Sequence, residues 1–111
     1  MVAISVDSNY GCRMVELIKS STFDAWLREL RDRRAVARIQ ARLDRLAAGN
    51  PGDVKPVGSG VSELRIDHGP GYRAYFMQRG PAVIVLPCGG DESSQSGDIE
   101  QAKAIAARWK D

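Results

Sequence analysis

The stretch Val61–Phe76 constrains the fold most, because apolar and charged residues alternate along it on both sides of a glycine-proline turn. Alternation with a period of two is typical of strands that have one buried face. Leu64 and Ile66 share one face of the first strand, and Ala74 and Phe76 share one face of the second. The intervening HisGlyProGly sequence suits a tight reversal. The stretch therefore predicts a β-hairpin with one core face and one charged face.

The charged face of this hairpin carries the first candidate functional residues. Four side chains are expected to point away from the core: Arg65, Arg73, Tyr75 and Arg79. A guanidinium group matches the geometry of a phosphate, which favours an anionic ligand. The alternative is a ladder of surface ion pairs with Glu63 and Asp67, which would contribute little to stability.

Two amphipathic helices are predicted before the hairpin. The first begins with Ser21 as its expected N-cap, and its apolar stripe consists of Phe23, Trp26, Leu27 and Leu30. The second ends near Gly49, and its buried positions are expected to be Val36, Ile39, Leu43 and Leu46.

The remaining pattern completes an α+β domain. Short strands are predicted at 15–18 and 82–88, residues 54–60 form a bridge, and a last amphipathic helix ends near Trp109. We expect an antiparallel-dominated four-stranded sheet, with the two N-terminal helices packed on one face, a C-terminal helix, and the other face open. Residues 1–13 are expected to be a flexible extension and residues 14–111 the single domain.

Composition narrows the class of protein. With 43% hydrophobic and 27% charged residues, the 111-residue chain has ordinary globular composition, which argues against disorder and coiled coils. The net charge is only +2, yet the segment from Arg28 to Arg45 holds seven arginines and three acids, so an anionic partner or a solvated helix face is indicated. Cys12 and Cys88 show no metal-ligand spacing and are expected to be reduced. Without a transmembrane or secretory pattern, we expect a cytoplasmic protein with no membrane contact.

From about Met14 to Trp109 the chain resembles the small toxins of the RelE/ParE superfamily, and specifically the HigB-like branch of addiction-module killer proteins. The motifs that carry this resemblance are GlyAspValLysProValGly, GluLeuArgIle, GlyProGlyTyrArg and CysGlyGlyAsp. The resemblance implies a RelE-like fold and the toxin of a type II toxin–antitoxin system. It also implies a cognate antitoxin encoded nearby, of the helix-turn-helix DNA-binding type. Such toxins either cut mRNA on the ribosome or, in the ParE-like branch, inhibit DNA gyrase without catalysis.

The same resemblance assigns roles to residues of this chain. It implies a metal-independent endoribonuclease without cofactors, in which the ribose 2′-OH attacks the adjacent phosphorus. Arg73 and Arg65 match the catalytic basic positions, and Lys55, Tyr75 and Arg79 are the expected contacts to RNA phosphates and bases. Where the branch usually has a lysine this chain has Glu92, whose charge opposes the transition state. A gyrase inhibitor, or a degenerate toxin that only binds an antitoxin, is therefore the alternative.

The sequence of the arginine-rich second helix is compatible with three interpretations. It could contact an RNA backbone, pair with an antitoxin, or simply keep the protein soluble.

Overall fold

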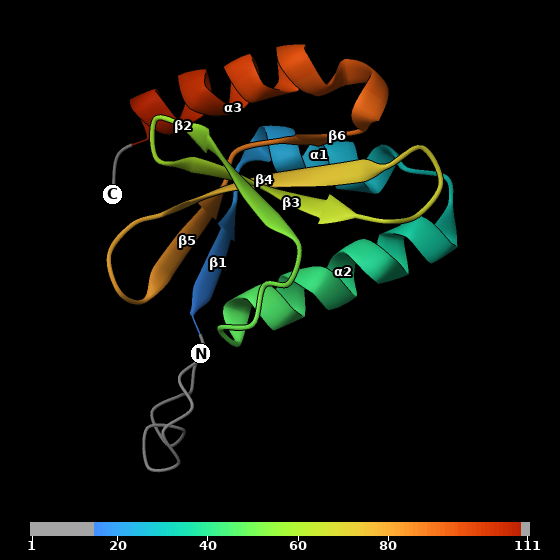
Figure 1. The fold of residues 1–111 in the computed structure, drawn as a ribbon, viewed down its shortest axis with the longest axis horizontal. Coiled ribbons are helices and arrows are strands. Elements are labelled where there is room, and N and C mark those ends of the chain that lie inside the picture. The colour runs from blue at the N-terminus through green and yellow to red at the C-terminus, as the bar shows by residue number, and fades with distance from the viewer. Residues whose placement is uncertain (1–14, 110–111) are drawn as a thin grey trace.

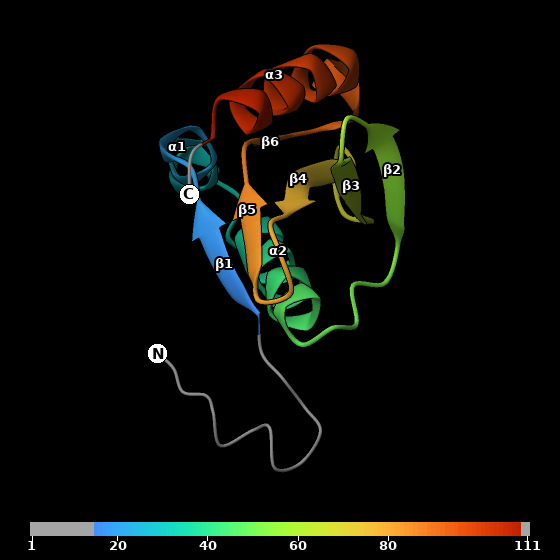
Figure 2. The ribbon, with the colours of Figure 1, turned by 90° about the vertical axis from the view of Figure 1, so that its left-hand side faces the viewer.

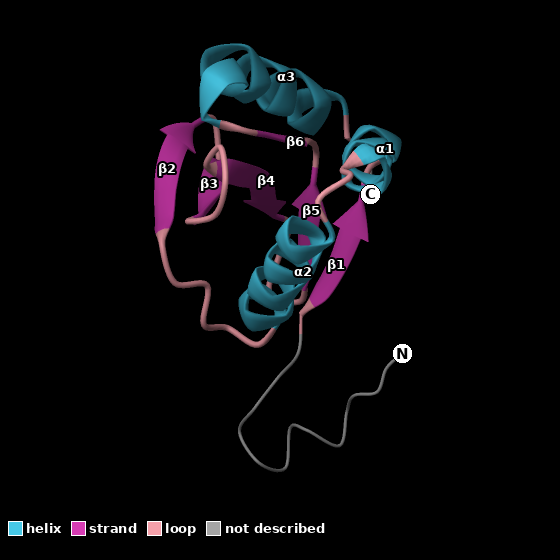
Figure 3. Cartoon of the chain, turned by 90° about the vertical axis from the view of Figure 1, so that its right-hand side faces the viewer, coloured by secondary structure: helices cyan, strands magenta, loops and turns pink. Residues whose placement is uncertain are grey.

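The fold is a mixed β-sheet that lies between helices on both faces (Figure 1). The structure is a computed structural model and describes residues 15–109. Helix α2 (Arg33–Ala47) lies on one side of the sheet and helix α3 (Gln95–Arg108) on the other, as two opposite views also show (Figures 2 and 3). The predicted extension, residues 1–13, lies outside the described residues.

Five strands form the sheet in the order β1-β5-β4-β3-β2, and a short sixth strand pairs with β4. Their bounds are β1 Glu16–Lys19, β2 Val54–Gly58, β3 Val61–Ile66, β4 Tyr72–Gln78, β5 Val83–Leu86 and β6 Gly89–Gly90. Strands β1 and β5 run parallel, and the other pairs are antiparallel.

The α+β class is confirmed, but the predicted count of four strands is wrong. Strand β2 was expected to be a bridge because it contains Pro56 and ends at Gly58, two residues that weaken a strand pattern. It forms because it lies at the sheet edge, where it pairs with β3 alone. The two-residue β6 has no side chains that could produce an alternating pattern.

The predicted hairpin is present as β3 and β4, and its core face packs as expected. Leu64 pairs with Ala74, and both are fully buried. They belong to a first core with α1 (Ser21–Glu29) and α2, whose buried or partly buried members include Phe23, Trp26, Leu27, Ile39, Leu43 and Leu46. Both N-terminal helices therefore contribute their apolar stripes to the same side of the sheet.

The face that was expected to be open is covered by α3. Val61, Tyr75 and Met77 on this face are buried in a second core, together with Val85, Cys88, Ala102 and Ala106. The expectation was wrong because alternation shows only that the two faces of a strand carry different kinds of side chain. It does not show that the charged face is exposed to solvent. Small residues such as Ala102 let α3 lie close to the strands.

The first helix is anchored to the sheet by its N-cap. The cap is Ser20 rather than the predicted Ser21: its Oγ accepts a hydrogen bond of 3.0 Å from the N–H of Phe23 and donates one to the carbonyl of Pro87. The Ser20 N–H also bonds to the Leu86 carbonyl, at 3.0 Å. Ser20 therefore joins the start of α1 to the end of β5.

The second helix is capped by Asp32. Its carboxylate accepts hydrogen bonds from the N–H groups of Arg34 and Ala35, at 3.0 and 3.2 Å, and lies 3.2 Å from Nε2 of His68. The Ala35 N–H and the His68 ring lower the pKa of this carboxyl. The hairpin turn is thereby joined to the start of α2.

The described cysteine is a free, buried thiol. Burial, and then the charge of Asp98, raise the pKa of Cys88 to about 12, so the thiol is protonated and unreactive near neutral pH. Cys12 lies outside the described residues. Within residues 15–109, no helix combines the length and the apolar character that crossing a membrane requires.

We predict that Ser20→Ala lowers the free energy of unfolding by about 1 to 2 kcal/mol, because a buried cap and its bond to Pro87 are both lost. The matched control Ser21→Ala removes an exposed hydroxyl one residue later and is expected to change stability by less than about 0.5 kcal/mol. Urea denaturation of both variants measures the difference, and equal losses would contradict the assignment of the cap.

Candidate functional site

Two arginines lie side by side on the face of the sheet that α3 covers. Arg65 of β3 is the register partner of Arg73 of β4, and we call these two residues the arginine pair. Directly opposed residues of an antiparallel ladder have Cβ atoms about 5 Å apart, and like charges in this arrangement destabilise the sheet. The repulsion must be offset by nearby carboxylates or by an anionic ligand.

Arg73 is held by a buried carboxylate. The fully buried Glu63 places its Oε1 atom 3.7 Å from Nη1 of Arg73, whose side chain is only 10% exposed. The other oxygen of Glu63 accepts hydrogen bonds from the Tyr75 hydroxyl, at 3.1 Å, and from the Gln95 amide, at 2.9 Å. We call these four residues the Glu63 cluster. Within the described part of the chain, Nε of Arg73 and Oε1 of Glu63 have no hydrogen-bond partner.

The exposure predicted for Arg73 and Tyr75 is therefore wrong. Tyr75 is fully buried, and burial, followed by the charge of Glu63, raises the pKa of its hydroxyl. The phenol stays protonated and donates to Glu63, so its ring has no face available to a base. The cause is α3, which packs on the face of the sheet that carries Arg73 and Tyr75.

Arg65 is the accessible member of the arginine pair. Its side chain is 43% exposed, and its Nε lies 3.9 Å from the carboxylate of Asp53. Arg42 supports this position from α2, because its guanidinium donates to the backbone carbonyls of Arg65, at 2.5 Å, and Pro51, at 2.8 Å. The loop before β2 is thereby fixed against β3.

Lys55 and Arg79 differ in their relation to the arginine pair. Lys55 is exposed on β2 and is the register partner of Glu63, so it stands in the neighbouring row of the same face. Arg79 lies six residues along the chain from Arg73, about 20 Å for an extended strand. Its Nη2 donates to the carbonyl of Trp109, the C-cap of α3. The structure therefore brings Lys55, Arg65 and Arg73 together and assigns Arg79 to the end of α3.

Acidic residues lie close to the arginine pair. A Cβ atom added to Gly90, the register partner of Arg73, would be 1.7 Å from Oδ2 of Asp98, so this carboxylate rests directly on β6. A Cβ atom on Gly71 would be 3.4 Å from Oε1 of Glu92. Glu92 therefore lies beside the hairpin turn.

Packing explains the CysGlyGlyAsp motif. Gly89 leaves room for Trp26, whose ring would be 2.3 Å from an added Cβ, and Gly90 leaves room for Asp98. Asp91 caps the short 3₁₀-helix Glu92–Ser94 by accepting from the N–H of Ser93, at 2.9 Å. The Ser93 hydroxyl and N–H bonds lower the pKa of the Asp91 carboxyl. The motif thus builds the turn that leads into α3.

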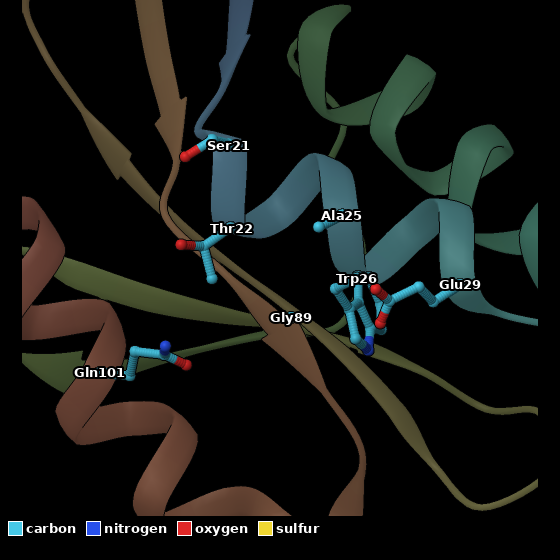
Figure 4. Close-up of a pocket in the computed structure, with 7 residues that line it drawn as sticks. All are labelled: Ser21, Thr22, Ala25, Trp26, Glu29, Gly89 and Gln101. Carbon is cyan, nitrogen blue, oxygen red and sulfur yellow. The ribbon is translucent and has the colours of Figure 1, made fainter.

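A shallow groove of about 480 Å³ lies between α1 and α3 (Figure 4). Gly89 forms part of its floor and the Trp26 ring part of its wall, and the other lining residues are Ser21, Thr22, Ala25, Glu29 and Gln101. None of the five predicted site residues lines it. This groove is therefore separate from the arginine pair.

Sequence analysis did not identify Glu63 and Gln95 as members of the site. Glu63 was interpreted as an exposed ion-pair partner of the arginines. It follows Val61 by two residues, however, and therefore lies on the same face of β3, which is buried. That spacing was the available signal. Gln95 stands in a polar run with no periodic pattern, so no signal marked it. Within residues 15–109, no three His, Cys, Asp or Glu side chains are grouped so that they could hold a metal ion.

Comparison with known proteins gives one relative that covers most of the chain. An uncharacterized protein of Haemophilus influenzae is 48% identical over 92 residues, which are 83% of this chain and 93% of that protein. No family model matches the chain.

We predict strong coupling within the Glu63 cluster. Arg73→Gln and Glu63→Gln should each lower the free energy of unfolding by about 3 kcal/mol, because each leaves a buried group without its ionic partner. The loss in the double variant should be smaller than the sum of the two single losses by at least about 1 kcal/mol. Chemical denaturation of the four proteins measures the cycle.

Arg65→Gln is the matched control, since its ion pair with Asp53 is exposed and should contribute less than about 0.5 kcal/mol. Additive losses in the double variant would show that Arg73 and Glu63 do not stabilise each other.

Proposed function

The chain belongs to the same family as this Haemophilus influenzae protein, and we propose that it is the toxin of a type II toxin–antitoxin system. In this proposal it is a metal-independent endoribonuclease that cuts mRNA on the ribosome and arrests translation. Its cognate antitoxin is encoded nearby and is of the helix-turn-helix DNA-binding type. The resemblance to HigB-like toxins supports the proposal, and so does the arginine pair.

The arginine pair is the observation that carries the proposal. In the free protein, Glu63 and Asp53 offset the repulsion between the two guanidinium groups of the arginine pair, and a phosphodiester between these groups supplies a further anion that both can bind. Attack by a 2′-OH increases the negative charge on the phosphoryl oxygens, so fixed cations stabilise the transition state more than the bound substrate. Lys55, in the neighbouring row, is placed to contact a flanking phosphate.

Glu63 adds a proton acceptor to this arrangement. Its Oε1 atom has no hydrogen-bond partner within the described residues and lies beside Arg73, so it suits removal of the 2′-OH proton. Because Glu63 is fully buried beneath Gln95, RNA reaches it only after the first turn of α3 moves. In this proposal, opening of that turn precedes cleavage.

A second candidate function rests on the acids near the arginine pair. The segment 91–98 supplies three carboxylates, from Asp91, Glu92 and Asp98, and no lysine, arginine, histidine or tyrosine. Carboxylates close to a scissile phosphate raise the energy of the transition state. This observation favours a protein that inhibits DNA gyrase without catalysis, or one that only binds its antitoxin.

We predict that induction of the protein produces mRNA ends at ribosomal A-site codons. Arg65→Gln should reduce the cleavage rate by roughly tenfold, through loss of one charge-assisted phosphate contact. Arg73→Lys keeps a positive charge beside Glu63 but loses the planar fork, and should reduce the rate by about a hundredfold. Transcript ends are mapped in cells that express each variant at the same level.

Arg108→Gln, an exposed change on α3, is the control and should cleave as the unchanged protein does. Growth arrest without new mRNA ends, together with loss of gyrase supercoiling activity, would replace the first proposal by the second.

We also predict that Glu92→Lys raises the cleavage rate, by roughly tenfold, because it replaces a repulsive charge beside the hairpin turn with an attractive one. Glu100→Lys makes the same change of charge on an exposed position of α3 and should have no effect. Equal rates for the two lysine variants would mean that Glu92 does not face the substrate.

A further inference from the structure

Helix α2 carries a row of arginines on the surface that faces away from the sheet. Arg34, Arg38 and Arg45 are exposed and fall within about 40° of one another around the helix axis, and we call them the α2 stripe. At a rise of 1.5 Å per residue, the stripe is about 16 Å long. Within the described residues, none of its guanidinium groups forms an ion pair.

Two nearby arginines, Arg28 and Arg42, have structural partners that the α2 stripe lacks. Arg28 of α1 pairs with Asp24, at 3.4 Å, and Arg42 of α2 donates to three backbone carbonyls. Arg34 and Arg38 stand four residues apart on one helix face, where like charges repel by a few tenths of a kcal/mol. The folded protein gains nothing evident from this repulsion, and an anionic partner would remove it.

The surface around the α2 stripe fits a phosphate backbone better than a protein. Exposed residues between and beside the arginines are small, namely Ala37, Ala41 and Ala48. Arginines anchor protein interfaces when they sit in well-packed pockets beside large apolar or aromatic side chains, and among the described residues the α2 stripe is flanked by alanines instead. The nearest acid on the helix, Asp44, accepts a hydrogen bond from Gln40, at 3.2 Å.

We propose that the α2 stripe binds the phosphodiester backbone of a nucleic acid. This contact is distinct from the arginine pair, because α2 and α3 lie on opposite sides of the sheet (Figures 1 and 2). Helix α2 packs on the first core, whereas the Glu63 cluster is bonded to α3 through Gln95. The contact is also independent of cleavage. The phosphate chemistry is common to RNA and DNA. We assign the stripe to structured RNA, an assignment that rests on the proposed function, and the test distinguishes duplex DNA as the other source of the same phosphates.

The test compares two charge-matched triple variants of the full chain. Arg34→Gln, Arg38→Gln and Arg45→Gln together remove the α2 stripe, while Lys19→Gln, Arg28→Gln and Arg108→Gln remove three exposed charges from β1, α1 and α3. Both leave the arginine pair and Glu63 intact. Fluorescence anisotropy measures binding to an RNA duplex and a DNA duplex of the same sequence over a range of salt concentrations.

We expect the stripe variant to lose at least tenfold in affinity at low salt, and the slope of log K against log salt to fall by about 2 to 3. The control variant should lose far less. Thermal melting should show that the stripe variant is as stable as the unchanged protein or slightly more stable, since helical repulsion is removed and glutamine keeps helix propensity. A larger loss with RNA assigns the stripe to RNA, and equal losses assign it to phosphates of either polymer.

Equal losses in the two triple variants would overturn the proposal, because net charge alone would then account for binding. Unchanged binding of both duplexes by the stripe variant would also overturn it and would indicate an acidic protein as the partner. Neither outcome depends on cleavage, so the mRNA experiment with Arg65 and Arg73 is decided separately.

Discussion

The buried carboxylate of Glu63 is the interaction on which the α3 side of the molecule depends. A charged group without access to water is tolerated only when it is paired and hydrogen-bonded, and Glu63 takes its partners from β4 and from the first turn of α3. Because Gln95 supplies one of these bonds, the Glu63 carboxylate helps to hold the first turn of α3 against the sheet. The ion pair with Glu63 also holds Arg73, whose side chain is only 10% exposed, so the contact that stabilises this side of the domain limits the access of a ligand to Arg73.

The sequence predicted the hairpin and its two faces because alternation is a local property of the strand. Leu64 and Ala74 could be assigned to the core from spacing alone, and Arg65 to the other face. Whether that other face meets water depends on a helix that lies about 30 residues further along the chain. Tyr75 therefore looked like a surface ring, although it is a buried donor. The carbonyl partner of Arg79 at the end of α3 was beyond the reach of any local pattern for the same reason.

Packing accounts for each residue type in the GlyGlyAsp part of the CysGlyGlyAsp motif, with no need for a catalytic role. Its glycines are required because Trp26 and Asp98 occupy the space that side chains would need, and its aspartate caps a short helix. A motif required for packing fixes the backbone of the turn and leaves the charge of the adjacent side chain free to vary. Glu92 illustrates this, since it stands in the turn built by the motif and carries the charge least suited to phosphoryl transfer. The motif therefore accounts for the shape of this turn and not for a chemical role of the residues beside it.

The arginine pair and the α2 stripe differ in whether carboxylates lie close to their guanidinium groups. The arginine pair is compensated by carboxylates, because Glu63 and Asp53 offset a repulsion that the sheet register imposes. The α2 stripe has no such compensation in the described residues, and its charges extend into solvent. At physiological ionic strength a field of this kind acts over roughly 8 Å, whereas the arginine pair acts only on a ligand in contact. The stripe is thus suited to first encounter with a polyanion. In the proposed function, the arginine pair acts in the step that follows, after the first turn of α3 has moved.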